Sequence, residues 1–135
     1  MRTRFDHVGL SVADLEAAER FYTSAFGFER QLVFDLTPHP IRGMMMTHRS
    51  GCRFELFEHA TSSAGPQAAG PIEAHANRGY SHFALAAPDI DEVFASALAA
   101  GATAVIEPRP SPEPGVRFAF VADPEGNLVE LVEKG

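Results

Sequence analysis

Hydrophobic and polar residues alternate along the chain with two different periods, which predict strands and helices in a regular order. Residues 5–12 alternate strictly, as in a strand with one covered face. Residues 15–26 carry apolar side chains at helical spacing, and Asp14 and Gly27 are suitable residues to begin and end a helix. Three further strands are expected over residues 28–34, 41–48 and 52–58. This part of the chain therefore predicts the order strand, helix and three strands.

The remainder of the chain predicts the same order after a stretch without a strong periodic pattern. Residues 60–79 are rich in Ala, Gly, Ser and Pro, which is typical of a linker or mobile loop. A strand over 80–87, a helix over 90–101 and strands over 103–108, 116–121 and 127–133 follow. We expect one α+β domain over residues 1–135, with halves at about 1–60 and 76–135 joined by the 60–79 loop.

The two predicted halves are related by a shift of 75 residues. Nine positions between residues 7 and 58 are identical after this shift, against about three expected by chance from ordinary composition. His7 falls on His82 and Glu55 falls on Glu130, so each half places a histidine on its first strand and a glutamate on its last. The separation of the two residues is 48 positions in both halves.

These four residues predict a metal site if the halves pack as a pseudo-symmetric pair. Small residues share the strand face of each histidine and leave room for a ligand: Gly9, Ser11, Ala84 and Ala86. A bound cation would also explain why Glu130 lies inside the apolar stretch NLVELVE, since an unpaired buried carboxylate is costly. An alternative is that all four residues face solvent and that the repeat reflects only the history of the fold.

The chemistry of two imidazoles and two carboxylates suits borderline divalent ions such as Zn, Ni, Co, Mn or Fe. Two neutral His, two ionised Glu and one dication sum to zero charge. The metal would polarise a carbonyl or enediolate oxygen, and Glu55 or Glu130 would act as the base for the adjacent proton. This combination favours isomerase or lyase chemistry through an enediolate over peptide hydrolysis.

Other repeated polar residues have less specific interpretations. Glu58 and Glu133 alternate onto the opposite strand face and are expected to be solvated. Arg42 and Arg117 occupy equivalent strands and could bind an anionic substrate, although solvated strand arginines are the simpler interpretation. Cys52 is expected to be a small packed residue.

Composition excludes several classes of protein. The net charge of −7 argues against a nucleic-acid-binding surface, and no apolar run approaches the length of a membrane span. One cysteine excludes an intramolecular disulfide and a cysteine-cluster metal site. Because Asp6 and His7 interrupt the N-terminal stretch where a signal peptide would be apolar, a cytoplasmic protein is expected.

Three segments resemble the signature sequences of the vicinal oxygen chelate superfamily, which includes glyoxalase I, bleomycin-resistance proteins and extradiol dioxygenases. They are HVGLSVADLEAAERFYTSAFGFE, GYSHFALAAPDIDEVFASALAAGA and FVADPEGNLVELVE. The resemblance covers nearly the whole chain except the 60–79 loop and is closest to glyoxalase I. It implies tandem βαβββ modules that form a cupped mixed sheet around one divalent metal, with helices outside, usually in a homodimer.

The resemblance places the metal ligands at His7, Glu55, His82 and Glu130. In glyoxalase I the glutamate ligands act as bases on a glutathione hemithioacetal, so Glu55 and Glu130 would take that role. Glyoxalase I usually has an arginine on the first strand that holds glutathione, and Ser11 stands at that position here. The departure puts the use of glutathione in question while leaving the metal chemistry intact.

Three functions follow from these patterns. The first is a divalent-metal-dependent lyase or isomerase of the glyoxalase type, acting on a small α-carbonyl or thiol-adduct substrate. The second is a methylmalonyl-CoA-epimerase-like isomerase, which would need a cationic patch for the nucleotide phosphates. The third is a non-catalytic protein that binds a drug or metabolite, as bleomycin-resistance proteins do. The metal, the substrate and the division of the site between subunits are left open.

Overall fold

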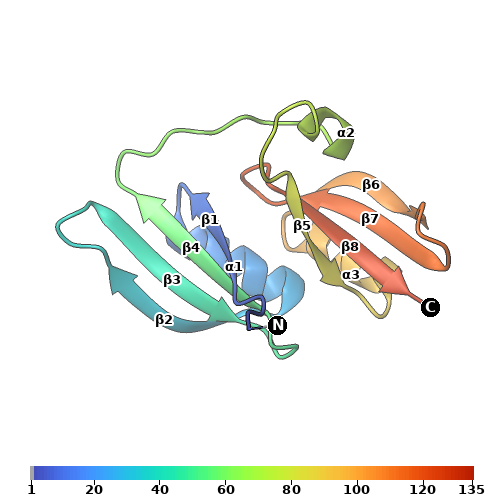
Figure 1. Cartoon of the computed structure of the whole chain (residues 1–135), viewed down its shortest axis with the longest axis horizontal. Helices are drawn as coiled ribbons and strands as arrows, with labels where there is room; N and C mark the ends of the chain where they lie inside the picture. The colour runs from blue at the N-terminus through green and yellow to red at the C-terminus, as the bar shows by residue number, and fades with distance from the viewer. Residues whose placement is uncertain (1) are drawn as a thin grey trace. The chain divides into compact units, whose positions relative to one another are not determined.

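The computed structural model describes residues 2–135 and divides into two compact units (Figure 1). The N-terminal unit ends at Ala64, and the C-terminal unit comprises Gly65–Gly135. This division falls inside the segment that the sequence identifies as a linker. Each unit contains one four-stranded sheet and one long helix.

The N-terminal unit has the order strand, helix and three strands that its sequence predicts. Its elements are β1 (Val8–Val12), α1 (Leu15–Phe26), β2 (Glu29–Asp35), β3 (Ile41–Thr47) and β4 (Arg53–His59). The strands lie in the order β1-β4-β3-β2. The first and last strands are parallel, and the other two pairings are antiparallel. The sheet is therefore mixed, with the parallel pair at one edge.

The C-terminal unit repeats this topology after a short additional helix. Its elements are α2 (Pro71–Ala74), β5 (His82–Ala86), α3 (Ile90–Ala99), β6 (Thr103–Pro110), β7 (Val116–Ala122) and β8 (Leu128–Lys134). The strand order is β5-β8-β7-β6, again with the first and last strands parallel. The predicted α+β fold of tandem βαβββ modules is confirmed.

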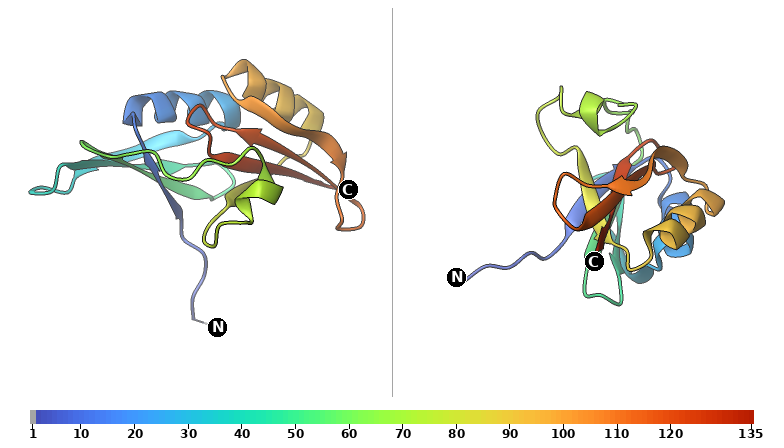
Figure 2. Two further views of the ribbon diagram at one scale, coloured as in Figure 1. Left: turned by 90° about the horizontal axis from the view of Figure 1, so that it is seen from above. Right: turned by 90° about the vertical axis from the view of Figure 1, so that its right-hand side faces the viewer.

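Each of the long helices α1 and α3 covers one face of the sheet in its own unit and forms a separate core with it (Figure 2). In the N-terminal unit the rings of Tyr22 on α1 and Phe54 on β4 meet edge to face at 4.8 Å between centroids. Neighbouring positions that alternate toward this helix are fully buried, including Met44, Met46 and Leu56. In the C-terminal unit the core residues on the helix and strands are Ile90, Phe94, Ala97, Ala119, Val121, Val129 and Leu131. Burial on this scale is the main source of stability for each unit.

Several element boundaries differ from the sequence prediction by one to three residues, and one short helix was not predicted. The first strand begins at Val8, so His7 lies immediately before it. Within the predicted linker, Pro71 begins the one-turn helix α2, because proline is well suited to the first helical position. A helix of four residues is too short to produce a periodic apolar pattern. Among the described residues, no helix is long and apolar enough to cross a membrane.

The turn before β8 is organised by a buried carboxylate. Asp123 is 4% exposed, and its Oδ1 accepts hydrogen bonds from the backbone N–H groups of Glu125 and Asn127, both at 2.9 Å. The Asn127 side chain also donates to Oδ2 of Asp123, at 2.9 Å. These bonds satisfy a charged group that would otherwise be costly to bury. They fix the point at which β8 enters the sheet.

We predict that Asp123→Ala lowers the free energy of unfolding by about 2–4 kcal/mol, because two backbone donors lose their acceptor. Asp123→Asn keeps an oxygen at Oδ1 and should lose about half as much. Urea denaturation of the two variants and the wild type would measure both effects. A loss below 1 kcal/mol in the alanine variant would contradict the role of this carboxylate.

Candidate metal-binding site

Each unit brings its predicted histidine and glutamate into contact. The Nε2 atom of His7 lies 3.2 Å from Oε1 of Glu55, and Nε2 of His82 lies 3.2 Å from Oε1 of Glu130. The exposed fractions of the four side chains are between 20% and 35%, so solvent and small ligands reach them. The same pair of atoms thus meets at the same distance in two separately folded sheets.

Strand pairing explains these contacts. On the parallel edge of the N-terminal sheet, Gly9 is paired with Glu55. Ala84 is paired with Glu130 in the C-terminal sheet. Side chains alternate along a strand, so a residue two positions before the paired one emerges from the same face. His7 and His82 are those residues. The spacing of 48 positions in each half is therefore the spacing that the register requires.

The second ring nitrogen of each histidine is already engaged by the preceding residue. Asp6 Oδ2 lies 2.6 Å from Nδ1 of His7, and Ser81 Oγ lies 2.8 Å from Nδ1 of His82. An ionised carboxylate only accepts hydrogen bonds, so Nδ1 of His7 carries the proton. In the neutral ring, Nε2 then presents a lone pair toward Glu55, which is the form that binds metals.

The charges around His7 shift the pKa values of both His7 and Asp6. The hydrogen bond to Asp6 raises the pKa of His7 above its ordinary value, with a further contribution from the charge of Glu55. The same hydrogen bond lowers the pKa of Asp6, and the guanidinium of Arg53 adds to this effect. A positively charged partner at Nε2 is thus favoured electrostatically, whether it is a proton or a metal cation.

The separation of the two ligand atoms suits coordination of one ion. Ligands about 2.1 Å from a metal at angles of 90–110° are about 3.0–3.4 Å apart. The observed 3.2 Å falls within this interval. The donor atoms of each pair therefore fit a divalent metal by both chemistry and spacing.

Apolar side chains lie beside each pair on its sheet face, and in the N-terminal unit the polar side chains of Arg53 and Gln31 lie there as well. In the N-terminal unit Glu55 is paired with Met45, and two residues further along β4 the ring of Phe57 packs edge to face with Phe34 of β2 at 5.9 Å. In the C-terminal unit the ring of Phe120 packs edge to face on His82 at 4.9 Å. Such surroundings favour contact with apolar parts of a ligand.

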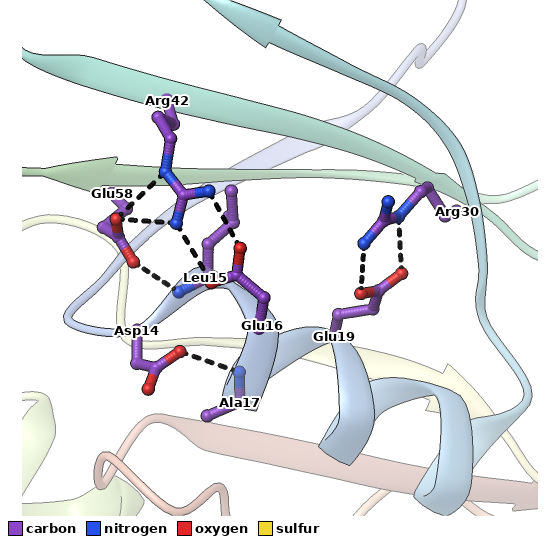
Figure 3. A network of polar contacts seen from close by, with 8 residues as sticks. All are labelled: Asp14, Leu15, Glu16, Ala17, Glu19, Arg30, Arg42 and Glu58. Atoms are coloured by element: carbon purple, nitrogen blue, oxygen red, sulfur yellow. Dashed lines mark hydrogen bonds and ion pairs between the residues drawn. The ribbon is translucent and has the colours of Figure 1, made fainter.

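The repeated arginines lie on the other face of each sheet. Arg42 donates to both Glu16 on α1 and Glu58 on β4, at 2.8–3.2 Å (Figure 3). In the C-terminal unit, Arg117 pairs with Asp91 at 3.0 Å and with Glu133 at 3.6 Å. A substrate-binding role for the two arginines stays a prediction, and these contacts favour a structural role.

The expectation that Glu58 and Glu133 are solvated was wrong. Oε2 of Glu58 accepts a hydrogen bond from the backbone N–H of Leu15 at 2.8 Å (Figure 3). Glu133 accepts the equivalent bond from Ile90 at 2.9 Å. Both donors belong to the first residue of a helix, where backbone N–H groups lack intrahelical partners and the helix dipole favours negative charge. Each glutamate therefore links the start of a helix to the last strand of its module through a hydrogen bond.

An acidic cluster lies beside the contact between Glu58 and the start of α1, and it has a simpler explanation than a bound metal. Ligand atoms of Asp14, Glu16 and Glu58 lie within 4.8 Å of one another. Arg42, however, supplies the positive charge, and its hydrogen bonds lower the pKa of Glu16 to about 2. Asp14 in turn accepts from the backbone N–H of Ala17 as the N-cap of α1. These contacts account for the cluster as part of the helix start.

Comparison with known proteins identifies the family. The model of the Glyoxalase/Bleomycin resistance protein/Dioxygenase superfamily matches residues 4–131. The chain belongs to this superfamily. The matched range includes the whole first module, the second module as far as the middle of β8, and all four predicted metal ligands. The resemblance that the sequence motifs indicate is thus confirmed for the fold and the superfamily.

Individual relatives are more distant. The chain is similar to a lactoylglutathione lyase of Arabidopsis thaliana, with 27% identity over 142 residues, 98% of this chain and 44% of the relative. It is 26% identical to a putative lactoylglutathione lyase of Brassica oleracea var. gemmifera over 99% of this chain and 45% of the relative. The chain thus spans less than half the length of these curated relatives.

Solved structures share the fold at low sequence identity. A glyoxalase family protein from Enterococcus faecalis aligns with a TM-score of 0.80 and 23% identity, covering 98% of both chains. Glyoxalase I from Zea mays aligns with a TM-score of 0.77 and 22% identity, covering 98% of this chain and 45% of that chain. These likenesses concern the fold.

We predict that Arg42→Met weakens the N-terminal unit in a pH-dependent way. The folded-state pKa of Glu16 is about 2, below its ordinary value of 4.5. Its contribution to stability is therefore present above about pH 4.5 and is lost as the pH falls toward 2. The variant should melt about 2–4 °C lower at pH 7 and show a flatter pH dependence of melting temperature below pH 4.5.

Arg30→Met is the matched control, since Arg30 forms its ion pair with Glu19, further along α1 (Figure 3). It removes the same charge from the same unit without touching the start of the helix. Thermal melts at pH 3, 5 and 7 would compare the variants. Identical pH profiles for both would contradict the coupling between Arg42 and Glu16.

Proposed function

We propose that His7, Glu55, His82 and Glu130 bind one divalent metal ion, and that the protein is a metal-dependent lyase or isomerase of the glyoxalase type. Its substrate would be a small α-carbonyl compound or a thiol adduct of one. The observation that carries this proposal is the repeated contact of histidine Nε2 with glutamate Oε1, at 3.2 Å in both units. Membership of the superfamily and the similarity to lactoylglutathione lyases support it.

The donor set has the charge that such a site needs. Two neutral imidazoles and two carboxylates balance one dication, so the assembled site carries no net charge. Imidazole and carboxylate together favour borderline ions, and Zn, Ni, Co, Mn and Fe all qualify. When bound, the metal would act as a Lewis acid that polarises a substrate carbonyl.

The chain's own groups would carry the proton. Glu55 or Glu130 would take it from the carbon next to the substrate carbonyl and return it to the neighbouring carbon, as general base and then general acid. The two histidines would hold the metal beside the carboxylates through their Nε2 atoms.

The surroundings of the pairs favour an uncharged or apolar substrate group. Ser11, the position where a glutathione-binding arginine is usual, is exposed. Arg42 and Arg117 are engaged by carboxylates on the helix side of each sheet, and Arg53, on the same face as Glu55, is paired with Asp6. Met45, Phe57 and Phe120 occupy the faces that carry the predicted ligands. An apolar thiol adduct fits these faces better than a ligand with several negative charges, such as an acyl-CoA.

The metal content of the purified protein tests the proposal. We expect about one divalent ion per site by elemental mass spectrometry of protein prepared without chelator or histidine tag. Glu130→Ala removes a ligand and should lower metal affinity at least tenfold. Glu107→Ala, an exposed residue of the same unit, is the matched control and should retain the metal. A wild-type protein that stays metal-free after reconstitution with Zn, Ni, Co, Mn and Fe would contradict the proposal.

A homodimer with shared sites predicts complementation between inactive variants. If the N-terminal pair of one subunit acts with the C-terminal pair of its partner, coexpressed His7→Ala and Glu130→Ala chains form heterodimers with one intact site. Random assortment then restores about one quarter of the wild-type sites. Isomerase activity on an aldehyde–thiol adduct and bound metal would both be measured. If all four ligands come from one chain, the mixture stays inactive.

A further inference from the structure

The N-terminal histidine has a charged support built from three elements of its sheet. Oδ2 of Asp6 contacts Nδ1 of His7 at 2.6 Å and accepts a hydrogen bond from Nη1 of Arg53 at 2.9 Å. Nη2 of Arg53 donates to the side-chain oxygen of Gln31 at 3.1 Å. A chain of polar contacts thus runs from β2 through β4 to His7.

The position of Arg53 links this support to the predicted metal ligand. Arg53 precedes Glu55 by two residues on β4, so both side chains emerge from the same face. One strand therefore carries the glutamate that faces Nε2 of His7 and the arginine that holds the partner of Nδ1. The ring of His7 is restrained from both of its nitrogen atoms by groups whose positions β4 sets.

The C-terminal unit has different residues at the equivalent positions. After the shift of 75 residues, Ser81 stands for Asp6, Leu128 for Arg53 and Ile106 for Gln31. His82 is held by a neutral hydroxyl at 2.8 Å and by the edge-to-face ring of Phe120. The two halves present the same ligand atoms but support them with different chemistry.

We propose that Asp6, held by Arg53, is a positioning residue that fixes the ring of His7 and makes the N-terminal pair the more strongly organised half of the metal site. This role rests on the proposed function. A carboxylate on the outer nitrogen fixes the tautomer of a ligating histidine and strengthens its other nitrogen as a donor. The bond from Arg53 restrains the exposed Asp6, which no core packing holds.

Zn²⁺ titration of metal-free protein by calorimetry tests this role. We expect Asp6→Ala to weaken Zn²⁺ binding about 10- to 100-fold, and Asp6→Asn, which keeps an acceptor oxygen, to weaken it less. Arg53→Met should produce an intermediate loss, because Asp6 remains but is no longer restrained. Ser81→Ala is the matched variant of the other half and should weaken binding less than Asp6→Ala.

Two further readouts separate positioning from folding. Asp6 is outside the core, so the melting temperature of the metal-free protein should stay unchanged in Asp6→Ala. Nitrogen NMR of the metal-free wild type at alkaline pH should show His7 protonated at Nδ1, and the variant should show a mixture of the two tautomers. A large drop in melting temperature would overturn the positioning role.

The outcomes distinguish the two proposals. A wild-type protein that does not bind Zn²⁺ would overturn the proposed metal site and the role of Asp6 with it. A wild type that binds Zn²⁺, with Asp6→Ala within about twofold of it, would overturn the role of Asp6 alone and leave the metal site in place. Equal losses of Zn²⁺ affinity in Asp6→Ala and Ser81→Ala would overturn the claim that the N-terminal pair is the more strongly organised half of the site.

Discussion

The parallel pairing of the first and last strands in each module determines which residues can form the site. In this register Gly9 lies opposite Glu55 and Ala84 lies opposite Glu130. A slip of one residue would move each glutamate to the helix-covered face, because the side-chain period of a strand is two. The contact between histidine and glutamate therefore depends on the pairing of strands that are about 40 residues apart in sequence. The chain between the two paired strands contains the helix and the two other strands of the module, and it is long enough to allow the parallel arrangement.

Because side chains alternate along a strand, two glutamates on the same strand have different roles on opposite faces of the sheet. Glu55 and Glu58 are three residues apart on β4 and emerge from opposite faces. Glu55 meets His7, whereas Glu58 accepts the first N–H of α1 and pairs with Arg42. The helix-side contacts hold the helix and β4 together, which fixes the strand that also presents Glu55. In each unit the last strand therefore carries both a glutamate that stabilises the helix contact and a glutamate of the candidate site.

The sequence predicts the elements well because their periods are strong and their boundaries carry clear signals. It also predicts both histidine–glutamate contacts, since the repeated spacing of 48 residues reflects the strand register. Glu58 and Glu133 were misjudged because alternation identifies the face of a residue but does not show that the start of a helix lies above it. A signal was present: Asp14, Arg42 and Glu58 repeat with the same shift as the ligands, which is expected of residues that act together.

Positions that differ between the halves carry information that the repeat alone does not. Asp6 and Arg53 have Ser81 and Leu128 as counterparts, so a search for repeated residues passes over them. Their charges cancel, with 2.9 Å between the carboxylate and the guanidinium. Asp6 can therefore hold His7 without adding net negative charge beside Glu55. This matters for the proposed site, in which two glutamates would balance one dication, because an uncompensated third carboxylate would upset that balance. Arg53 makes a charged support for His7 compatible with an electrically neutral metal site.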